Sequence, residues 1–329
     1  MKESRAQLLV TGTYRSGSEY LSNLIGLNKE ISSSMYRVNA YRFGKNYETD
    51  QCHKNARCYL TETDERLTER YGMSLDIDEI LGAAGGNLRL SNLYNCIMNS
   101  LYIKEGKSIW AEKNQLVWRD LERFTNEMPN GKGVLLIRDP RSVLVSFKKY
   151  TIAEDPLYLE AIFNCLDAMR LGMEWKEHDS KDIIVVKYED LATDPKRIYR
   201  KICSLVGARE TNISSEEIRL ANFKDAYGKT WNSNSSFEGN QKAFDVAAAI
   251  DRWKDRISIE DLQLCEMVCG EYMEAFGYDK KVARIDENKC YERTRTSKVI
   301  NEHMVKWLET GEGIQKFPLN PLDKKTWEK

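Results

Sequence analysis

The stretch that most constrains the fold is residues 7–21, QLLVTGTYRSGSEYL, in which a short apolar run gives way to a small, hydroxyl-rich turn. Residues 8–10 are all apolar, which is typical of a strand buried on both faces of a parallel sheet. Gly12 and Gly17 permit a tight loop, and Ser18 can cap a helix that follows. A loop that ends at a helix N-terminus directs backbone N–H groups and the positive end of the helix dipole to one point. The stretch therefore predicts a strand, a loop and a helix with an anion site in the loop.

The loop lacks the residues that bind a Mg²⁺ nucleotide. In the pattern GxxxxGK[ST] the Lys binds the β- and γ-phosphates and the hydroxyl binds Mg²⁺. Aligning Gly12 and Gly17 with that pattern puts Ser18 at the Lys position and Glu19 at the hydroxyl position. This argues against a nucleotide kinase or NTPase. The positive charge lies instead at Arg15, whose planar guanidinium can bind phosphate or sulfate with two hydrogen bonds. The structural alternative is an ordinary Ser- and Gly-containing turn before a helix.

Composition excludes several other classes. A chain of 329 residues with 41% hydrophobic residues can bury a substantial core, in one large α/β domain or one and a half. The net charge of −1 gives no general attraction to nucleic acid or anionic membranes. No apolar run is long enough for a transmembrane helix. Only about six residues precede the first predicted strand, too few for a signal peptide, so we expect a cytoplasmic protein.

The eight cysteines show no CxxC spacing and no paired histidines, so the sequence predicts neither a zinc site nor a redox motif. We expect reduced thiols, several of them in the core.

Residues 31–63 show no clear hydrophobic period and are rich in Tyr, Arg and Asn, which predicts a long irregular surface segment. Its aromatic residues could form a wall of an acceptor site, or could simply pack the segment down. These residues are Tyr36, Tyr41, Phe43, Tyr47 and Tyr59. Residues 64–82 and 88–104 are predicted to be helical.

Strands and helices alternate from residue 108 onward. Short apolar runs at 109–111 and 133–137 predict strands, a helical pattern lies between them at 116–124, and Pro140 opens another helix. A further buried strand is predicted over 182–187. Such alternation predicts a parallel sheet and an α/β fold.

Arg138 follows the strand 133–137, and the carboxyl end of such a strand is where open α/β sheets bind their ligands. Ser142 and Ser146 follow on one face of the next helix. Helices are also predicted over 156–175 and 297–309.

Three motifs in this order resemble the sulfotransferase family. The loop YRSGSEYL is similar to the 5′-phosphosulfate loop of that family. RDPRSVLVS, in which Ser146 follows Arg138 by eight positions, resembles its 3′-phosphate segment, and WAEKN at 110–114 resembles the W-x-E-K segment of the bacterial and Golgi-like branch. The resemblance covers residues 6–280.

The resemblance implies a three-layer α/β fold, with a mostly parallel central sheet flanked by helices, in the P-loop-like nucleotide fold of sulfotransferases. It implies one domain over 1–280, in which 31–105 forms an acceptor-side insertion of loops and helices. Residues 281–329 would form a C-terminal arm or tail that packs on the domain or contacts a second copy in a homodimer.

The resemblance also implies the activity, which is transfer of the sulfuryl group of 3′-phosphoadenosine 5′-phosphosulfate (PAPS) to a hydroxyl of a carbohydrate or small metabolite. The co-substrate is left as 3′-phosphoadenosine 5′-phosphate (PAP). No metal is implied, because Arg15 and Lys113 would stabilise the charge that develops on the bridging oxygen. The residues implied to bind the co-substrate are Arg15, Ser16, Gly17, Ser18, Glu19, Tyr20, Arg138, Ser146 and Tyr188. Ser235, Ser236 and Lys242 are additional candidate phosphate contacts.

Two residues depart from the family pattern. Glu19 stands where Thr or Ser is usual, and Gln115 stands where the cytosolic branch has a His. The general base therefore stays open among Glu112, His53, Glu62 and Asp64. The alternative is a catalytically silent relative that only binds PAPS or PAP.

Overall fold

The computed structural model describes residues 2–47, 52–104, 106–150, 156–221 and 246–316. At its centre is a five-stranded sheet in the order β2-β3-β1-β4-β5, with every neighbouring pair parallel. The strands are β1 (Ala6–Gly12), β2 (Ile31–Met35), β3 (Ile109–Lys113), β4 (Gly131–Ile137) and β5 (Ile183–Lys187). Because all five run the same way, their carboxyl ends share one edge of the sheet.

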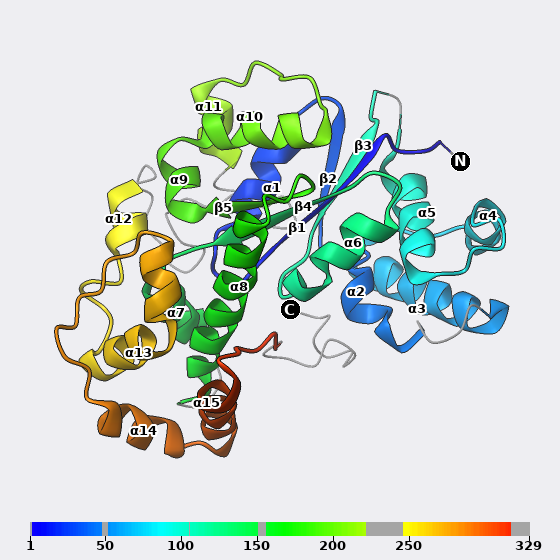
Figure 1. Cartoon of the computed structure of the whole chain (residues 1–329). Helices are drawn as coiled ribbons and strands as arrows, with labels where there is room; N and C mark the ends of the chain where they lie inside the picture. The colour runs from blue at the N-terminus through cyan, green and yellow to red at the C-terminus, as the bar shows by residue number, and fades with distance from the viewer. Residues whose placement is uncertain (1, 48–51, 105, 151–155, 222–245, 317–329) are drawn as a thin grey trace.

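Helices cover both faces of this sheet and make it the middle of three layers (Figure 1). Leu8 and Val10 pack on one face with α1 (Ser18–Gly26) and α10 (Pro195–Val206), whereas Leu9 packs on the other. This separation follows from the alternation of side chains along a strand. The α/β fold expected from the sequence is confirmed.

The remaining helices extend both outer layers. Near the N-terminal half they are α2 (Ala40–Phe43), α3 (His53–Tyr71), α4 (Ile77–Ala83), α5 (Leu90–Tyr102) and α6 (Leu121–Glu127). In the second half they are α7 (Pro140–Tyr150), α8 (Glu160–Glu177), α9 (Tyr188–Thr193), α11 (Ser215–Ala221), α12 (Val246–Asp251), α13 (Ile259–Ala275), α14 (Glu287–Arg295) and α15 (Lys298–Thr310). Within the described ranges, no helix is both long and apolar enough to cross a membrane.

The prediction of an irregular segment over 31–63 is wrong. The segment begins with β2, whose sequence ISSSM does not resemble a buried strand because β2 lies at the sheet edge, where its serine hydroxyls bond to the backbone of neighbouring elements. Ser34 Oγ, for example, donates to the Ala111 carbonyl at 3.2 Å. The segment also contains α2 and the first half of α3. Tyr41 and Tyr59 are buried in the core, so they pack the segment down and do not line a wall.

The helix predicted over 64–82 is in fact two helices. Gly72, at φ 62°, ends α3, and Asp76 caps α4 by accepting the Glu79 N–H at 2.9 Å. The helix predicted over 297–309 is confirmed as α15.

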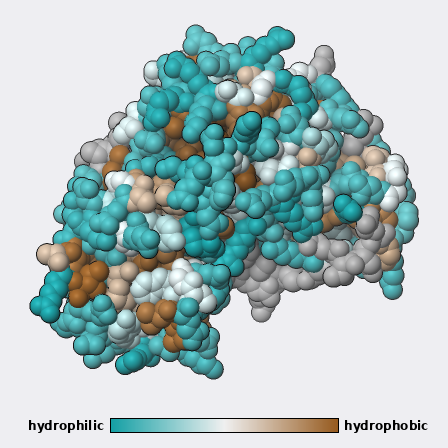
Figure 2. All heavy atoms as spheres, in the orientation of Figure 1, coloured by the Kyte–Doolittle hydropathy of each residue, from teal (hydrophilic) through white to brown (hydrophobic). Residues whose placement is uncertain are grey.

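Residues 311–316 lie against α8. The Ile314 N–H donates to the Phe163 carbonyl at 3.1 Å, and a Cβ at Gly313 would come within 2.2 Å of that same oxygen. On the outer surface, hydrophilic side chains cover most of the face in Figure 2, and apolar ones form small separate groups.

Candidate functional site

The loop between β1 and α1 lies at the carboxyl edge of the central strand. Arg15 and Gly17 take left-handed backbone conformations, with φ of 66° and 91°. Ser16 closes the turn, because its N–H and its Oγ both reach the Thr13 carbonyl, at 3.3 and 2.8 Å. Left-handed residues of this kind turn successive N–H groups toward one concave side, which suits an anion.

The prediction that Ser18 caps the helix is wrong. Gly17 takes the N-cap position, and Ser18 is the first helical residue of α1. No side chain accepts a hydrogen bond at the cap. The first turn of α1 thus keeps its N–H groups free of a side-chain cap, which leaves them suited to an external anion.

The predicted 3′-phosphate segment meets this loop. Arg15 Nε donates to Ser146 Oγ at 2.9 Å, and Arg138 Nη1 donates to the Arg15 carbonyl at 3.0 Å. Arg138 also donates to the Ala249 carbonyl. The structure therefore brings Arg15, at the end of β1, together with Arg138 and Ser146, which follow β4 more than a hundred residues later in the sequence.

Tyr188 completes this corner from the end of β5. The Arg138 guanidinium carbon lies 4.1 Å from the centre of the Tyr188 ring, a cation–π contact. A Cβ at Gly17 would lie 2.4 Å from the same ring, so only glycine allows the loop to approach so closely. Tyr20 is buried on α1, and burial, with a smaller effect of Tyr188, raises the pKa of its hydroxyl. Both predicted adenine-side aromatics thus lie beside the loop.

Lys113, the last residue of β3, is fully buried beneath the loop. Its Nζ lies 3.7 Å from Glu19 Oε1 and 3.7 Å from the centre of the Tyr36 ring, and it has no hydrogen-bond partner among the described residues. Burial, the largest effect, lowers the pKa of the ammonium to about 8; the Glu19 carboxylate opposes this, and the charge of Arg15 adds to it. A buried cation without a hydrogen bond is suited to an incoming anion.

Glu112 lies on the opposite face of β3 from Lys113, because neighbouring side chains alternate. Its buried carboxylate accepts from the N–H groups of Val38 and Asn39 at 2.7 and 3.0 Å and from the Tyr94 hydroxyl at 2.5 Å. It also accepts from the side chain of Asn114 at 2.9 Å. Glu112 therefore holds the chain after β2 in place.

The other three candidate bases lie on α3. His53 is exposed in its first turn, Glu62 is exposed and faces Tyr47, and Asp64 accepts the Leu75 N–H at 2.7 Å. None of these described contacts involves the loop or Lys113. Sequence patterns single out carboxylates and histidines without showing which way they point, and here the direction decides.

Sequence reasoning missed how Tyr36 and Gln115 serve this site. The Tyr36 hydroxyl donates to Gln115 Oε1 at 2.6 Å, and Gln115 Nε2 reaches Ser18 Oγ at 3.5 Å. This chain of contacts fixes the ring that covers Lys113. Tyr36, at φ 59°, was recognisable only as one aromatic among several.

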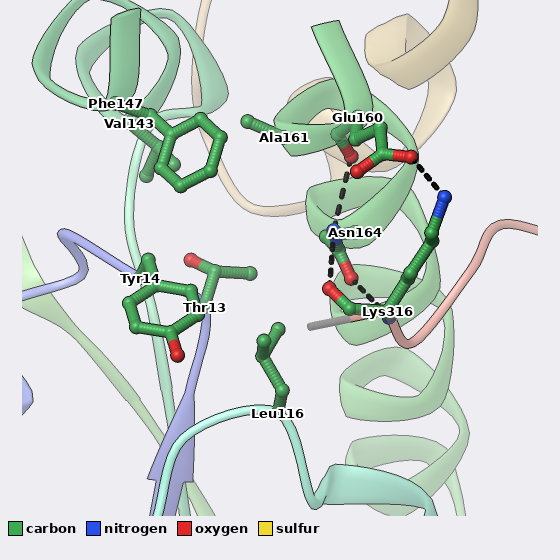
Figure 3. Close-up of a pocket in the computed structure, with 9 residues that line it drawn as sticks. All are labelled: Thr13, Tyr14, Leu116, Val143, Phe147, Glu160, Ala161, Asn164 and Lys316. Carbon is green, nitrogen blue, oxygen red and sulfur yellow. Dashed lines mark hydrogen bonds and ion pairs between the residues drawn. The ribbon is translucent and has the colours of Figure 1, made fainter. Parts of the chain in front are cut away.

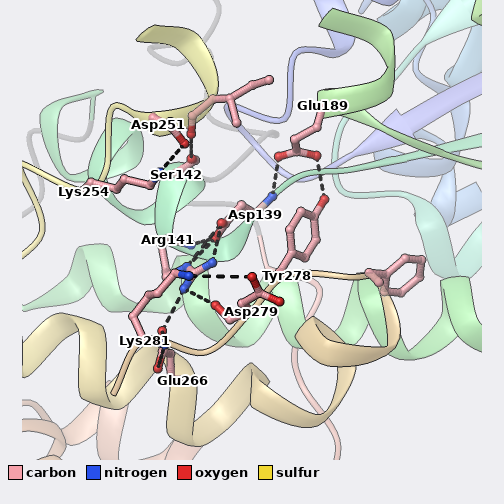
Figure 4. Close-up of polar contacts among 12 residues, drawn as sticks. Asp139, Arg141, Ser142, Glu189, Asp251, Lys254, Glu266, Tyr278, Asp279 and Lys281 are labelled. Atoms are coloured by element: carbon pink, nitrogen blue, oxygen red, sulfur yellow. Dashed lines mark hydrogen bonds and ion pairs between the residues drawn. The ribbon is translucent and has the colours of Figure 1, made fainter. Parts of the chain in front are cut away.

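A second missed feature is a buried ion cluster around Asp139 and Arg141, directly after Arg138 in the chain (Figure 4). Arg141 donates from Nε and Nη2 to both carboxylate oxygens of Asp139, at 2.8 to 3.2 Å. Its Nη1 donates to Glu266 Oε1 and to the Asp279 carbonyl, both at 2.8 Å, and its guanidinium carbon lies 3.9 Å from the centre of the Trp253 ring. We call Asp139, Arg141 and Glu266 the arginine cluster.

Neighbouring contacts tie the same turn to α9 and α12. Glu189 accepts from the Asp139 N–H at 3.1 Å and from the Tyr278 hydroxyl at 2.7 Å. Ser142 Oγ donates to the Ile250 carbonyl at 3.1 Å. Of the two serines on the predicted helix face, Ser142 is therefore used in packing and only Ser146 meets Arg15.

A small hollow, with room for about one water molecule, lies beside the loop (Figure 3). One wall is the loop itself, and the others come from the chain after β3, from α7, from α8 and from the segment after α15. The lining residues are Thr13, Tyr14, Leu116, Val143, Phe147, Glu160, Ala161, Asn164 and Lys316. Its surface is mostly apolar, with an ion pair between Glu160 and Lys316 at one side.

Two predictions have no further structural counterpart. Ser235, Ser236 and Lys242 lie outside the described residues. Over the part of the chain that the structure describes, no group of three or more His, Cys, Asp or Glu side chains is arranged to hold a metal ion.

Comparison with known proteins agrees with this geometry. The sulfotransferase family model matches residues 7–211, more than half of the 329 residues. The sulfotransferase domain of the Synechococcus PCC 7002 olefin synthase is similar in structure, with a TM-score of 0.53 at 17% identity over 85% of this chain and 97% of that one. The sulfotransferase domain from the curacin biosynthetic pathway gives a TM-score of 0.53 at 15% identity, over 85% and 100%. No curated protein matches the sequence.

Proposed function

Because the chain belongs to the sulfotransferase family, we propose that it transfers the sulfuryl group of PAPS to a hydroxyl acceptor. The observation that carries this proposal is the meeting of Arg15, Arg138 and Ser146 at one corner of the sheet edge. Two guanidinium groups beside a loop with an uncapped helix end suit a ligand that carries two separate phosphate groups.

Each residue at this corner would bind a different part of the co-substrate. Arg15 and the N–H groups of residues 16–19 would hold the 5′-phosphosulfate. Arg138 and Ser146 would hold the 3′-phosphate, which ATP lacks. Tyr188 and Tyr20 would stack on or border the adenine, and stacking of this kind contributes about 1 to 3 kcal/mol per base.

Lys113 fits the catalytic step. In sulfuryl transfer the bond from sulfur to the bridging oxygen breaks as the acceptor oxygen attacks, and negative charge develops on the bridging oxygen. A buried ammonium without a hydrogen-bond partner stabilises such charge more strongly than a solvated one. The pKa of about 8 leaves Lys113 mostly protonated at neutral pH, as this role requires.

The acceptor that we propose is a carbohydrate or another small hydroxyl compound. The hollow beside Tyr14 lies next to the loop and has apolar walls with polar side chains at one side, but it has room for about one water molecule and would have to widen to admit such an acceptor. No described contact assigns the base that takes the acceptor proton.

The proposal is tested by titrating PAP, ATP and ADP into the protein without Mg²⁺, in a calorimeter. We expect PAP to bind in the micromolar range and more tightly than ATP, and Arg138→Ala to weaken PAP binding by about tenfold or more. The matched control is Arg200→Ala, which removes an exposed arginine paired with Glu210. Equal binding of ATP, or an unchanged affinity in Arg138→Ala, would contradict the proposed donor site.

Transfer is tested with ³⁵S-labelled PAPS and a panel of sugars, phenols and small alcohols. Labelled product that depends on Lys113 supports an enzyme. PAP binding without transfer to any acceptor would instead support a silent relative. Glu19 beside Lys113 is the observation that favours this second possibility.

A further inference from the structure

We propose that Glu19 is a built-in counter-ion of Lys113, which holds the buried ammonium in place in the ligand-free protein and gives it up when the anionic donor binds. This inference rests on the proposed function. It gives a role to the residue at which the chain departs most clearly from the family pattern.

The geometry brings the two groups together from separate elements of the fold. Glu19 lies in the first turn of α1, and Lys113 ends β3 directly below. Their charged atoms are 3.7 Å apart, within reach of an ion pair but beyond a hydrogen bond. The Tyr36 ring covers another side of the ammonium at 3.7 Å. Lys113 is thus confined between a ring and a carboxylate.

The two partners differ in their contact with water. The Lys113 side chain is 0% exposed, whereas that of Glu19 is 30% exposed. Lys113 cannot regain hydration without leaving the core, but Glu19 can turn toward solvent. The carboxylate is therefore the mobile member of the pair, and the ammonium is the fixed one.

Three groups from different parts of the fold surround the Lys113 ammonium, and two of them are charged. Glu19 contributes the negative charge from α1, Arg15 contributes a positive charge from the loop, and Tyr36 contributes a neutral ring from the chain after β2. Without Glu19, Lys113 would face only Arg15 and the ring. A buried ammonium beside a guanidinium is disfavoured, so the carboxylate keeps it protonated.

Donor binding must disturb this arrangement. A 5′-phosphosulfate in the loop brings negative charge to the first turn of α1, where Glu19 already carries one. Repulsion then drives the carboxylate toward water, and the donor takes over as the partner of Lys113. A Thr or Ser at this position would have no charge to remove.

The first readout needs no ligand. The titration of Lys113 is followed by NMR in protein labelled with [ε-¹³C]lysine, with the signal assigned by its loss in Lys113→Met. In the wild type we expect a pKa of about 8. In Glu19→Gln we expect it below about 7, because an opposite charge at this distance is worth one or more pKa units. The control is Glu216→Gln, an exposed first-turn glutamate of α11, paired with Arg219, which should leave it unchanged.

The second readout is PAP binding between about pH 6 and pH 8.5 in the same three proteins. At pH 6 Lys113 is charged in all of them, so Glu19→Gln, which lacks the repulsion, should bind PAP more tightly than wild type. At pH 8.5 its lysine is the more fully deprotonated, so the advantage should shrink or reverse. The ratio of the two dissociation constants should change by about tenfold over this range, which matches one pKa unit.

Glu19→Thr serves as a second variant, and thermal unfolding of each protein confirms that it is folded. An unchanged pKa of Lys113 in both Glu19 variants would overturn the inference, whatever happens to binding. A lowered pKa with a pH-independent binding ratio would overturn the displacement by the donor. If the wild type binds no PAP, the proposed function fails, and the NMR titration still decides whether Glu19 is the counter-ion.

Discussion

At the scale of single residues, two neighbours on β3 have different roles because their side chains point to opposite faces of the sheet. Glu112 and Lys113 are neighbours in the segment WAEKN, yet they face opposite sides of β3. The carboxylate of Glu112 is surrounded by four donors, and the ammonium of Lys113 has none of its hydrogen bonds satisfied within the described residues. Glu112 therefore stabilises the fold, whereas the buried ammonium of Lys113 lowers the stability of the protein and is available for a ligand.

Lys113→Met tests this trade-off. The substitution keeps the length of the side chain but removes a charge that lies in the core. We expect kcat to fall by at least ~10²-fold, the scale of losing one electrostatic stabiliser of a transition state. At pH 7 we expect the free energy of unfolding to rise by roughly 1 to 3 kcal/mol, because the variant no longer buries an ammonium whose pKa is lowered to about 8.

The pH dependence of this stability gain follows from the direction of the shift. Between the native pKa of about 8 and the unfolded value of 10.5, the unfolded wild type binds more protons than the native state. Wild-type stability therefore rises with pH through this range, and the gain of Lys113→Met shrinks. Urea unfolding at pH 7 and pH 10 measures both values. If Lys113→Met were less stable than the wild type at pH 7, the buried charge would not be destabilising the fold.

At the scale of elements, the loop depends on how closely β1, α1 and the end of β5 approach one another. The motif that indicated this loop was short and contained its own glycines, so the order of strand, loop and helix could be predicted from sequence, although the capping residue could not. The contact with Tyr188 could not be predicted, because it depends on a residue far along the chain. The first half of α3 was missed because its few buried apolar positions, such as Ala56 and Leu60, stand among polar and charged residues.

Gly17→Ala tests whether PAP binding depends on the close contact between the loop and the Tyr188 ring, as distinct from the strain of a left-handed backbone. The new Cβ would lie 2.4 Å from the Tyr188 ring, so the ring or the loop must move. We expect PAP affinity to fall by about tenfold or more. The control is Gly72→Ala, whose φ of 62° is also left-handed but whose Cβ would meet nothing within 4 Å. Each substitution should destabilise the fold by about 1 to 2 kcal/mol from the left-handed conformation alone. Equal PAP affinity in the two variants would show that the contact with Tyr188 is unimportant for binding.

At the scale of the whole molecule, the far part of the chain supports the anion-binding edge from behind. Arg141 follows β4 by a few residues, yet its guanidinium is held by Glu266 of α13 and by the Asp279 carbonyl. Tyr278 reaches Glu189 in the same region. The sequence predicted that both segments belong to one fold, but it gave no sign that an ion cluster joins them, because such pairs lack a regular spacing.

Arg141→Met tests whether this cluster supports the site. The change leaves two carboxylates, Asp139 and Glu266, buried beside each other without their cation. Breaking a buried network in this way destabilises a protein by about 3 to 5 kcal/mol, and urea unfolding should show a loss on that scale. The matched control is Arg219→Met on α11, whose exposed pair with Glu216 should leave the free energy of unfolding nearly unchanged.

The same variant should also weaken PAP binding, because Asp139 is the neighbour of Arg138 and its position is set by Arg141. The measurement is PAP titration at a temperature where Arg141→Met is still folded, as judged by circular dichroism. A folded variant with wild-type affinity would mean that the turn after β4 keeps its shape without the cluster. A folded variant with weakened affinity, while Arg219→Met binds normally, would place Arg141 among the residues that position Arg138 for the 3′-phosphate.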